Sequence, residues 1–155
     1  MPRGRSRLPS SPLARGAVAG FAGAMAMSVS TNAEMRLRDR PPSDAPAKAL
    51  SRLLGIDAGG PRRRMALAFG GHLATSVSLG AARGALAKAG VSSGPALGAL
   101  LGLALLPEIL VVPALGAAPP PWRWSGADAA IGVLHHGVYA VTTNEAYGLL
   151  DRRGG

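Results

Sequence analysis

Glutamate and histidine lie inside stretches of this sequence that are otherwise free of charge. Glu108 is the only charged residue between Lys88 and Arg123, and His136 lies in the uncharged run before Glu145. An ionisable side chain within a membrane span is costly to bury, so each one is a candidate for function. An imidazole titrates near neutral pH and a carboxylate beside it favours the protonated ring. A Glu–His pair at this depth would therefore hold or pass a proton.

The expected depths of these residues indicate how they pair. With helices that alternate in direction and rise about 1.5 Å per residue, Glu108 and His136 lie at similar distances from the surface that their helices share. They are expected to meet near mid-membrane, and Glu34 and His72 are expected to meet nearer one face. Two roles stay open for Glu108 and His136: the favoured one is a polar contact that fixes two helices together, and the other is a pathway for a proton or solute. For Glu34 and His72, the favoured interpretation is a solvated position at the membrane interface or the same kind of polar contact.

Other chemistries find little support. The chain has no Cys, which excludes disulfides and thiolate catalysis. His135 neighbours His136 but points about 100° away on a helix, and no third metal ligand has a recognised spacing. Hydrolase, zinc-protease and nucleotide-binding motifs are missing from the sequence. We therefore expect neither an enzyme, nor a cofactor, nor a metal site.

The segment that carries Glu108 is the strongest candidate for a membrane span. Eleven Leu, Ile and Val residues lie between Leu97 and Leu115. At roughly −0.3 to −0.6 kcal/mol each they favour insertion by about 5 kcal/mol. A mid-span carboxylate costs about 3 kcal/mol on a comparable scale, so the segment can insert together with its acid.

Three further uncharged runs, rich in Gly, Ala, Ser and Thr, complete a predicted all-α bundle of four transmembrane helices. The expected spans are 14–35, 65–87, 95–118 and 127–149, within a single membrane domain over 13–153. Residues 1–12 read as a disordered basic tail. An amphipathic helix at 46–55 is expected either on the membrane surface or packed on the bundle.

Small residues at four-residue intervals predict where the helices touch. The strongest signal is the triple Gly94, Gly98 and Gly102, and a second pair is Gly80 and Gly84. Such spacing lets two backbones approach closely. After the third span, Trp122 and Trp124 suit the headgroup layer as interface anchors. Arg83, near the end of the second span, is expected to extend towards the membrane surface.

The formal net charge is +9, and most of it comes from Arg clustered beside the apolar runs. This placement is typical of charges that face anionic headgroups, and no nucleic-acid-binding motif accompanies it. The expected partners are the lipid bilayer and either a second copy or another membrane protein, without nucleic acid. Positive charges are divided almost evenly between the two predicted sides, so the positive-inside rule does not orient the chain.

The order of these features resembles the small inner-membrane proteins of the YagU-like type found in bacteria. The matching stretches are Pro113–Trp124 and His135–Arg153. The resemblance implies a multi-span protein of the bacterial plasma membrane and brings no reaction with it. Similar spacing after His72 and His136 also suggests two duplicated helical hairpins. We expect a structural or partner-binding role in the bacterial envelope, with a small proton-coupled transporter or permease as the alternative.

Overall fold

A computed structural model describes residues 11–154, and all of its regular structure is helical, which confirms the predicted all-α class. The elements are α1 (Pro12–Leu37), α2 (Ala45–Leu54), α3 (Pro61–Lys88), α4 (Ser93–Leu106), a π-helical turn η1 (Pro107–Val111), α5 (Val112–Ala114), a short 3-10 turn η2 (Pro121–Arg123) and α6 (Gly126–Gly154). Residues 1–10 of the predicted tail lie outside the described residues. Ser11 and Pro12 begin α1 instead of belonging to a tail.

Local sequence explains where these helices begin and end. The Ser11 hydroxyl accepts a hydrogen bond from the backbone N–H of Ala14 at 3.2 Å, and Pro12 follows as the first helical residue. Ser125 caps α6 in the same way, by accepting from the N–H of Asp128 at 3.1 Å. Helix α2 stops at Gly55, whose φ of 64° suits a residue without a side chain. The helix boundaries therefore follow from capping residues that the sequence displays.

Within residues 11–154, three helical segments, and not the predicted four, are long and apolar enough to cross a membrane: Pro12–Leu37, Pro61–Lys88 and Ser93–Ala114. The remaining long helix, α6, has the length but carries His135, His136 and a Thr-Thr-Asn-Glu run that lower its hydropathy. Three predicted spans thus correspond to helices that satisfy both requirements.

The distribution of apolar and polar side chains between surface and interior is inverted relative to that of a water-soluble bundle. The buried positions hold mainly Ala, Gly and polar residues, whereas large apolar side chains on α1 such as Phe21, Met25 and Val29 are exposed. Similar exposed residues lie on the other long helices, among them Phe69, Leu110 and Val141. An apolar exterior of this extent is unfavourable in water and favourable in lipid.

Glycine brings α1 and α3 into backbone contact near one end of the bundle. A methyl group added to Gly16 would lie 2.1 Å from the carbonyl oxygen of Gly80, and one added to Gly80 would lie 2.3 Å from that of Gly16. Gly20 faces Ser76 and Gly80, and Gly84 faces the backbone of Pro12 with equally little room. The predicted packing role of Gly80 and Gly84 therefore agrees with the structure, and any side chain there would push the helices apart.

The stronger packing prediction, the triple on α4, is wrong within this chain. A methyl group built at Gly94, Gly98 or Gly102 would meet no described atom within 4 Å. Helix α4 instead buries Ala96, Leu100 and Ala104, and Leu100 and Ala104 pack against Tyr139 and Ala140 of α6. The two stripes share the same four-residue spacing and lie two positions, or about 200°, apart on the helix. Spacing alone does not tell which stripe faces the neighbour.

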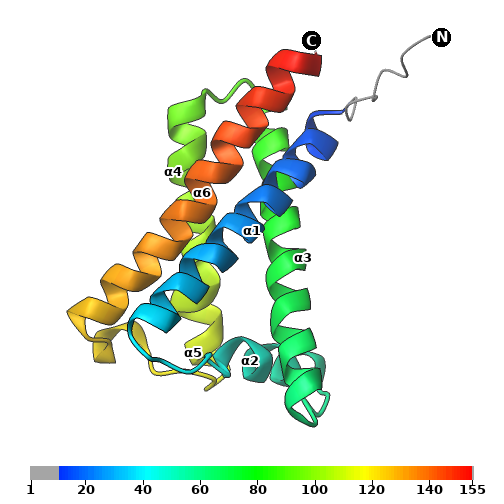
Figure 1. Ribbon diagram of the computed structural model, residues 1–155. Helices are drawn as coiled ribbons and strands as arrows, with labels where there is room; N and C mark the ends of the chain where they lie inside the picture. The colour runs from blue at the N-terminus through cyan, green and yellow to red at the C-terminus, as the bar shows by residue number, and fades with distance from the viewer. Residues whose placement is uncertain (1–10, 155) are drawn as a thin grey trace, which may run out of the picture.

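The close contact at one end is accompanied by separation at the other. Figure 1 shows α1 and α6 running side by side while α3 diverges from them, with α2 and α5 between the separated ends. The Arg52 guanidinium of α2 donates a hydrogen bond to the backbone oxygen of Leu115, just after α5. The predicted amphipathic helix thus packs on the bundle, with Ala47, Ala49 and Ser51 buried and Leu53 exposed.

We expect Gly80→Ala to destabilise the protein by about 1–3 kcal/mol, because the added methyl group meets backbone atoms that no rotamer can avoid. Gly98→Ala is the matched control: it faces open space and gains helix propensity, so stability should hold or rise slightly. Thermal unfolding in detergent measures both. Equal stability of the two variants would show that the α1–α3 contact is looser than described.

Candidate functional site

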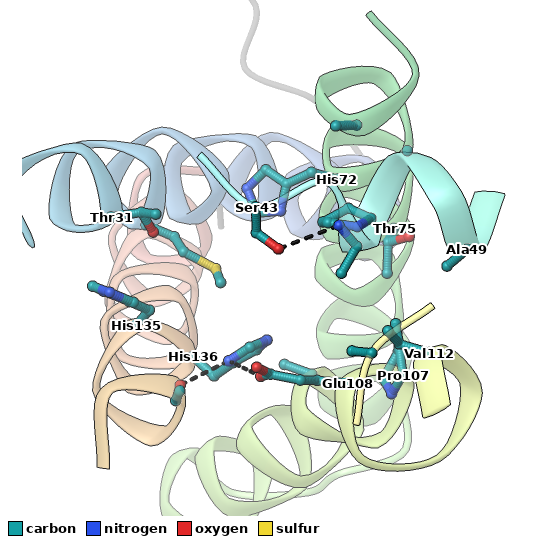
Figure 2. A pocket seen from close by; sticks show the side chains of 18 of the residues that line it. Thr31, Ser43, Ala49, His72, Thr75, Pro107, Glu108, Val112, His135 and His136 are labelled. Atoms are coloured by element: carbon teal, nitrogen blue, oxygen red, sulfur yellow. Dashed lines mark hydrogen bonds and ion pairs between the residues drawn. The ribbon is translucent and has the colours of Figure 1, made fainter. Parts of the chain in front are cut away.

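A cavity of about 820 Å³, here called the central cavity, lies between the diverging helices. Residues of α1, α2, α3, η1 and α6 line it. Its polar lining includes Thr31, Ser43, His72, Thr75, Glu108 and His136. A volume of this size is within the range of small-molecule sites. The splay of α1 and α3 thus creates a space into which several of the predicted site residues project (Figure 2).

Glu108 and His136 point towards each other from η1 and α6, as their expected depths predict (Figure 2). His136 Nδ1 lies 3.3 Å from Glu108 Oε2 and 2.8 Å from the carbonyl oxygen of Gly132. Because a carbonyl oxygen can only accept, Nδ1 carries the hydrogen and donates it to Gly132.

The carboxylate of Glu108 is incompletely satisfied. Its Oε2 atom is buried and has no hydrogen-bond partner among the described residues, although it is close to His136. The side chain as a whole is 39% exposed, so the rest of the carboxylate is accessible from the central cavity. A buried carboxylate oxygen without a donor is unfavourable, and a bound proton or a ligand donor would relieve it.

Two prolines shape the segment that presents Glu108. Pro107 and Pro113 have no N–H, so the carbonyl oxygens four residues earlier lose their usual helical donors. The helix responds by widening into the π-helical turn η1, in which the N–H of Val112 bonds to the carbonyl oxygen of Pro107. Such turns are frequent at functional sites because they reorient side chains and free backbone acceptors.

The expected pairing of Glu34 with His72 is wrong. Glu34 forms ion pairs with Arg40 at 2.7 Å and with Arg38 at 3.1 Å, whereas His72 Nε2 lies 3.5 Å from the carbonyl oxygen of Ala24. Ala24 is ten residues before Glu34 on α1, or about 15 Å along the axis. The tilt of α3 across α1 therefore separates the two side chains. His72 lines the central cavity instead (Figure 2).

Glu34 belongs to a cluster at the end of α1. The hydrogen bond from Arg40 to its carboxylate raises the pKa of the Arg40 guanidinium, so this pair stays ionised. His135 joins the cluster from α6: its Nε2 lies 3.9 Å from Glu34, and its Nδ1 lies 2.8 Å from the hydroxyl of Ser30. His135 thus turns towards α1, away from His136, and the cluster ties α1 to α6.

Sequence reasoning missed the buried Tyr139, which lies one turn beyond His135 and His136 on α6. Its hydroxyl donates a 2.7 Å hydrogen bond to the carbonyl oxygen of Ser76 and thereby joins α6 to α3. The signal was present, because Tyr139 follows the two histidines by three and four residues and so lies on the same side of the helix. Gly23, which touches Tyr139 and Thr143 with no room for a side chain, gave no such signal.

The two tryptophans have different environments. Trp122 is 82% exposed, as a headgroup anchor requires. Trp124 contributes to the wall of the central cavity, and its indole N–H donates to the carbonyl oxygen of Pro119 at 2.9 Å.

Across residues 11–154, no three His, Asp or Glu side chains are grouped so that they could hold a metal ion.

No protein-family model matches this chain, and neither does any curated protein or solved structure. The YagU-like resemblance therefore stays a prediction, and the case for function depends on the geometry of the central cavity.

We expect Tyr139→Phe to lower the free energy of unfolding by about 1 kcal/mol, because it removes one buried hydrogen bond between α6 and α3. Ser78→Ala removes a bond of similar length within α3 itself, at an exposed position, and should have a smaller effect. Thermal unfolding of both variants in the same detergent makes the comparison. An equal loss in the two would mean that the Tyr139 hydroxyl does not hold the helices together.

Proposed function

We propose that this chain is a four-span protein of the bacterial plasma membrane, with α6 as the fourth span. The outer face of α6 supports this: Val133, Leu134, Val141 and Leu149 are each at least half exposed. Its polar residues His135, Thr143 and Asn144 are buried against the other helices. A helix of moderate hydropathy can cross a bilayer when its neighbours cover its polar face.

Within that bundle we propose a small proton-coupled transporter, whose solute occupies the central cavity. The observation that carries the proposal is the contact of Glu108 with His136 at the edge of an 820 Å³ space, with one carboxylate oxygen left without a donor. A purely structural pair would be expected to satisfy its buried acceptors. A pair that takes up a proton or binds a donor group of a ligand needs an acceptor oxygen that no donor of the protein already occupies.

The geometry suggests how a proton and a solute are linked. A proton on His136 places a positive charge beside the Glu108 carboxylate and attracts it from within the protein. Without that proton the carboxylate has no positive partner at this contact, and its open oxygen attracts a donor group of a solute. The affinity for a polar solute with N–H or O–H groups therefore depends on the protonation of the pair.

A structural or partner-binding role is the second candidate. One observation favours it: the same Glu108–His136 contact joins η1 to α6, and polar contacts of this kind hold membrane helices together. This role predicts a loss of stability when the contact is removed, with no movement of protons or solute in the unmodified protein.

Membrane integration is tested first. We expect the protein to stay in the pellet when bacterial membranes are extracted with alkaline carbonate, as integral proteins do, because the exposed apolar faces of its long helices need lipid. Release into the supernatant would contradict the proposed span arrangement.

Transport is tested in proteoliposomes that contain a trapped pH-sensitive dye, with a panel of small polar solutes added outside. We expect one solute class to drive proton entry, and Glu108→Gln and His136→Leu each to reduce that flux at least tenfold. Glu145→Gln is the matched control, since it makes the same change to an exposed carboxylate of α6 that does not line the central cavity. A solute-dependent flux that survives both cavity substitutions would overturn the transport mechanism. No flux from the unmodified protein, together with a lower Tm for Glu108→Gln, would favour the structural role.

A further inference from the structure

Arg83, near the last turn of α3, is buried where a surface position was expected. Only 5% of the residue is exposed. Its Nε donates a 2.8 Å hydrogen bond to Asn144 Oδ1, and its guanidinium lies 4.4 Å from the centre of the Tyr147 ring. Asn144 in turn donates to the Ser93 hydroxyl at 2.7 Å. A neutral amide and an aromatic ring thus hold a full positive charge inside the bundle.

This charge has no negative partner among the described residues. No carboxylate oxygen there lies within ion-pair distance of Arg83, and its Nη1 atom is buried without a hydrogen-bond partner. The nearby acid Asp151 is paired with Arg15 at 2.8 Å. A buried cation that is not neutralised is strongly unfavourable, so the arrangement calls for an anion from outside the chain.

A pocket of about 360 Å³ beside Arg83 has room for such an anion. Ser93, Asn144 and Arg152 also line it. The Ser93 hydroxyl accepts from Asn144, which leaves its own hydrogen to donate. Arg152 adds a second positive charge, while the acids on the wall are Asp151 and the exposed Glu145. Donors therefore converge from α3, α4 and α6.

We propose that this pocket binds a phosphate group, either of an anionic phospholipid or as a free ion. A phosphate offers several acceptor oxygens to donors on different sides, which suits two guanidinium groups and a hydroxyl. The pocket is lined by the last turns of α3 and α6 and the start of α4. This is the end of the bundle where α1 begins (Figure 1), and headgroups lie at this depth if α3 and α6 span the membrane. The bound phosphate neutralises the charge of Arg83 and connects α3, α4 and α6. This site is separate from the central cavity and does not depend on transport.

Asn144→Asp tests the proposal, because it gives Arg83 a carboxylate partner within the chain at 2.8 Å. The variant should keep the fold and no longer require an external anion to neutralise Arg83. Arg153→Gln is the matched control, since it also lowers the net charge by one but at an exposed position of α6 that does not line the pocket. Thermal unfolding in a non-ionic detergent is measured with inorganic phosphate, with short-chain phosphatidylglycerol, and with sodium chloride of equal ionic strength.

We expect at least one phosphate compound to raise the Tm of the unmodified protein and of Arg153→Gln by about 5 °C at a hundredfold excess over Kd, and sodium chloride to have no such effect. Asn144→Asp should show less than a third of that rise. A rise with phosphatidylglycerol alone identifies a lipid headgroup, and a rise with inorganic phosphate as well identifies a site for the free ion. No rise with either compound, or an equal rise in Asn144→Asp, overturns the proposal. A misfolded Asn144→Asp is recognised by its circular dichroism, and Ser93→Ala, which removes one donor, then takes its place with the same expectations.

Discussion

Direct contact between the backbones of α1 and α3 is the constraint on which the rest of this structure depends. Four glycines, Gly16, Gly20, Gly80 and Gly84, let the helices touch with no side chain between them. Two straight helices that cross this closely at one end must separate at the other. The separation gives room for α2 and α5 and for the central cavity between them (Figure 1). The site therefore follows from packing that lies at a distance from it.

Lipid as the surrounding medium accounts for the inverted distribution of side chains. The interior is made of small residues and of polar groups such as Tyr139, Asn144 and Arg83, while large apolar residues lie outside. In water this arrangement would lose most of the hydrophobic stabilisation, whereas in lipid close packing and hydrogen bonds between helices take over. Buried polar groups then have large effects, because each unsatisfied one lacks water as a substitute. This is why the open oxygen of Glu108 and the unpaired charge of Arg83 are informative.

The two sites differ in the properties that a ligand needs in order to bind. At the central cavity, a carboxylate and an imidazole lie 3.3 Å apart, and the proposed binding of a solute there is linked to a proton on this pair. At the pocket beside Arg83, a permanent positive charge is held by neutral groups, and the proposed binding of a phosphate there requires a negative charge on the ligand and no proton on the protein. A contact that a proton can change is suited to reversible binding of a solute, and a permanent charge is suited to long-lived binding of a phosphate.

Composition and local pattern were sufficient to predict the helical class, three of the four expected spans and the contact of Glu108 with His136. These follow from composition, from the ends of uncharged runs and from the constant rise of a helix, all of which are local properties. Three features needed the packed fold to be known: which stripe of α4 is buried, that Glu34 pairs with Arg38 and Arg40 while His72 faces the central cavity, and that Arg83 turns inward. Each of those outcomes depends on the rotation of a helix about its axis and on its tilt against a neighbour. The rotation and the tilt are set by contacts between residues far apart in the chain. The four-residue spacing of small residues is compatible with several rotations equally.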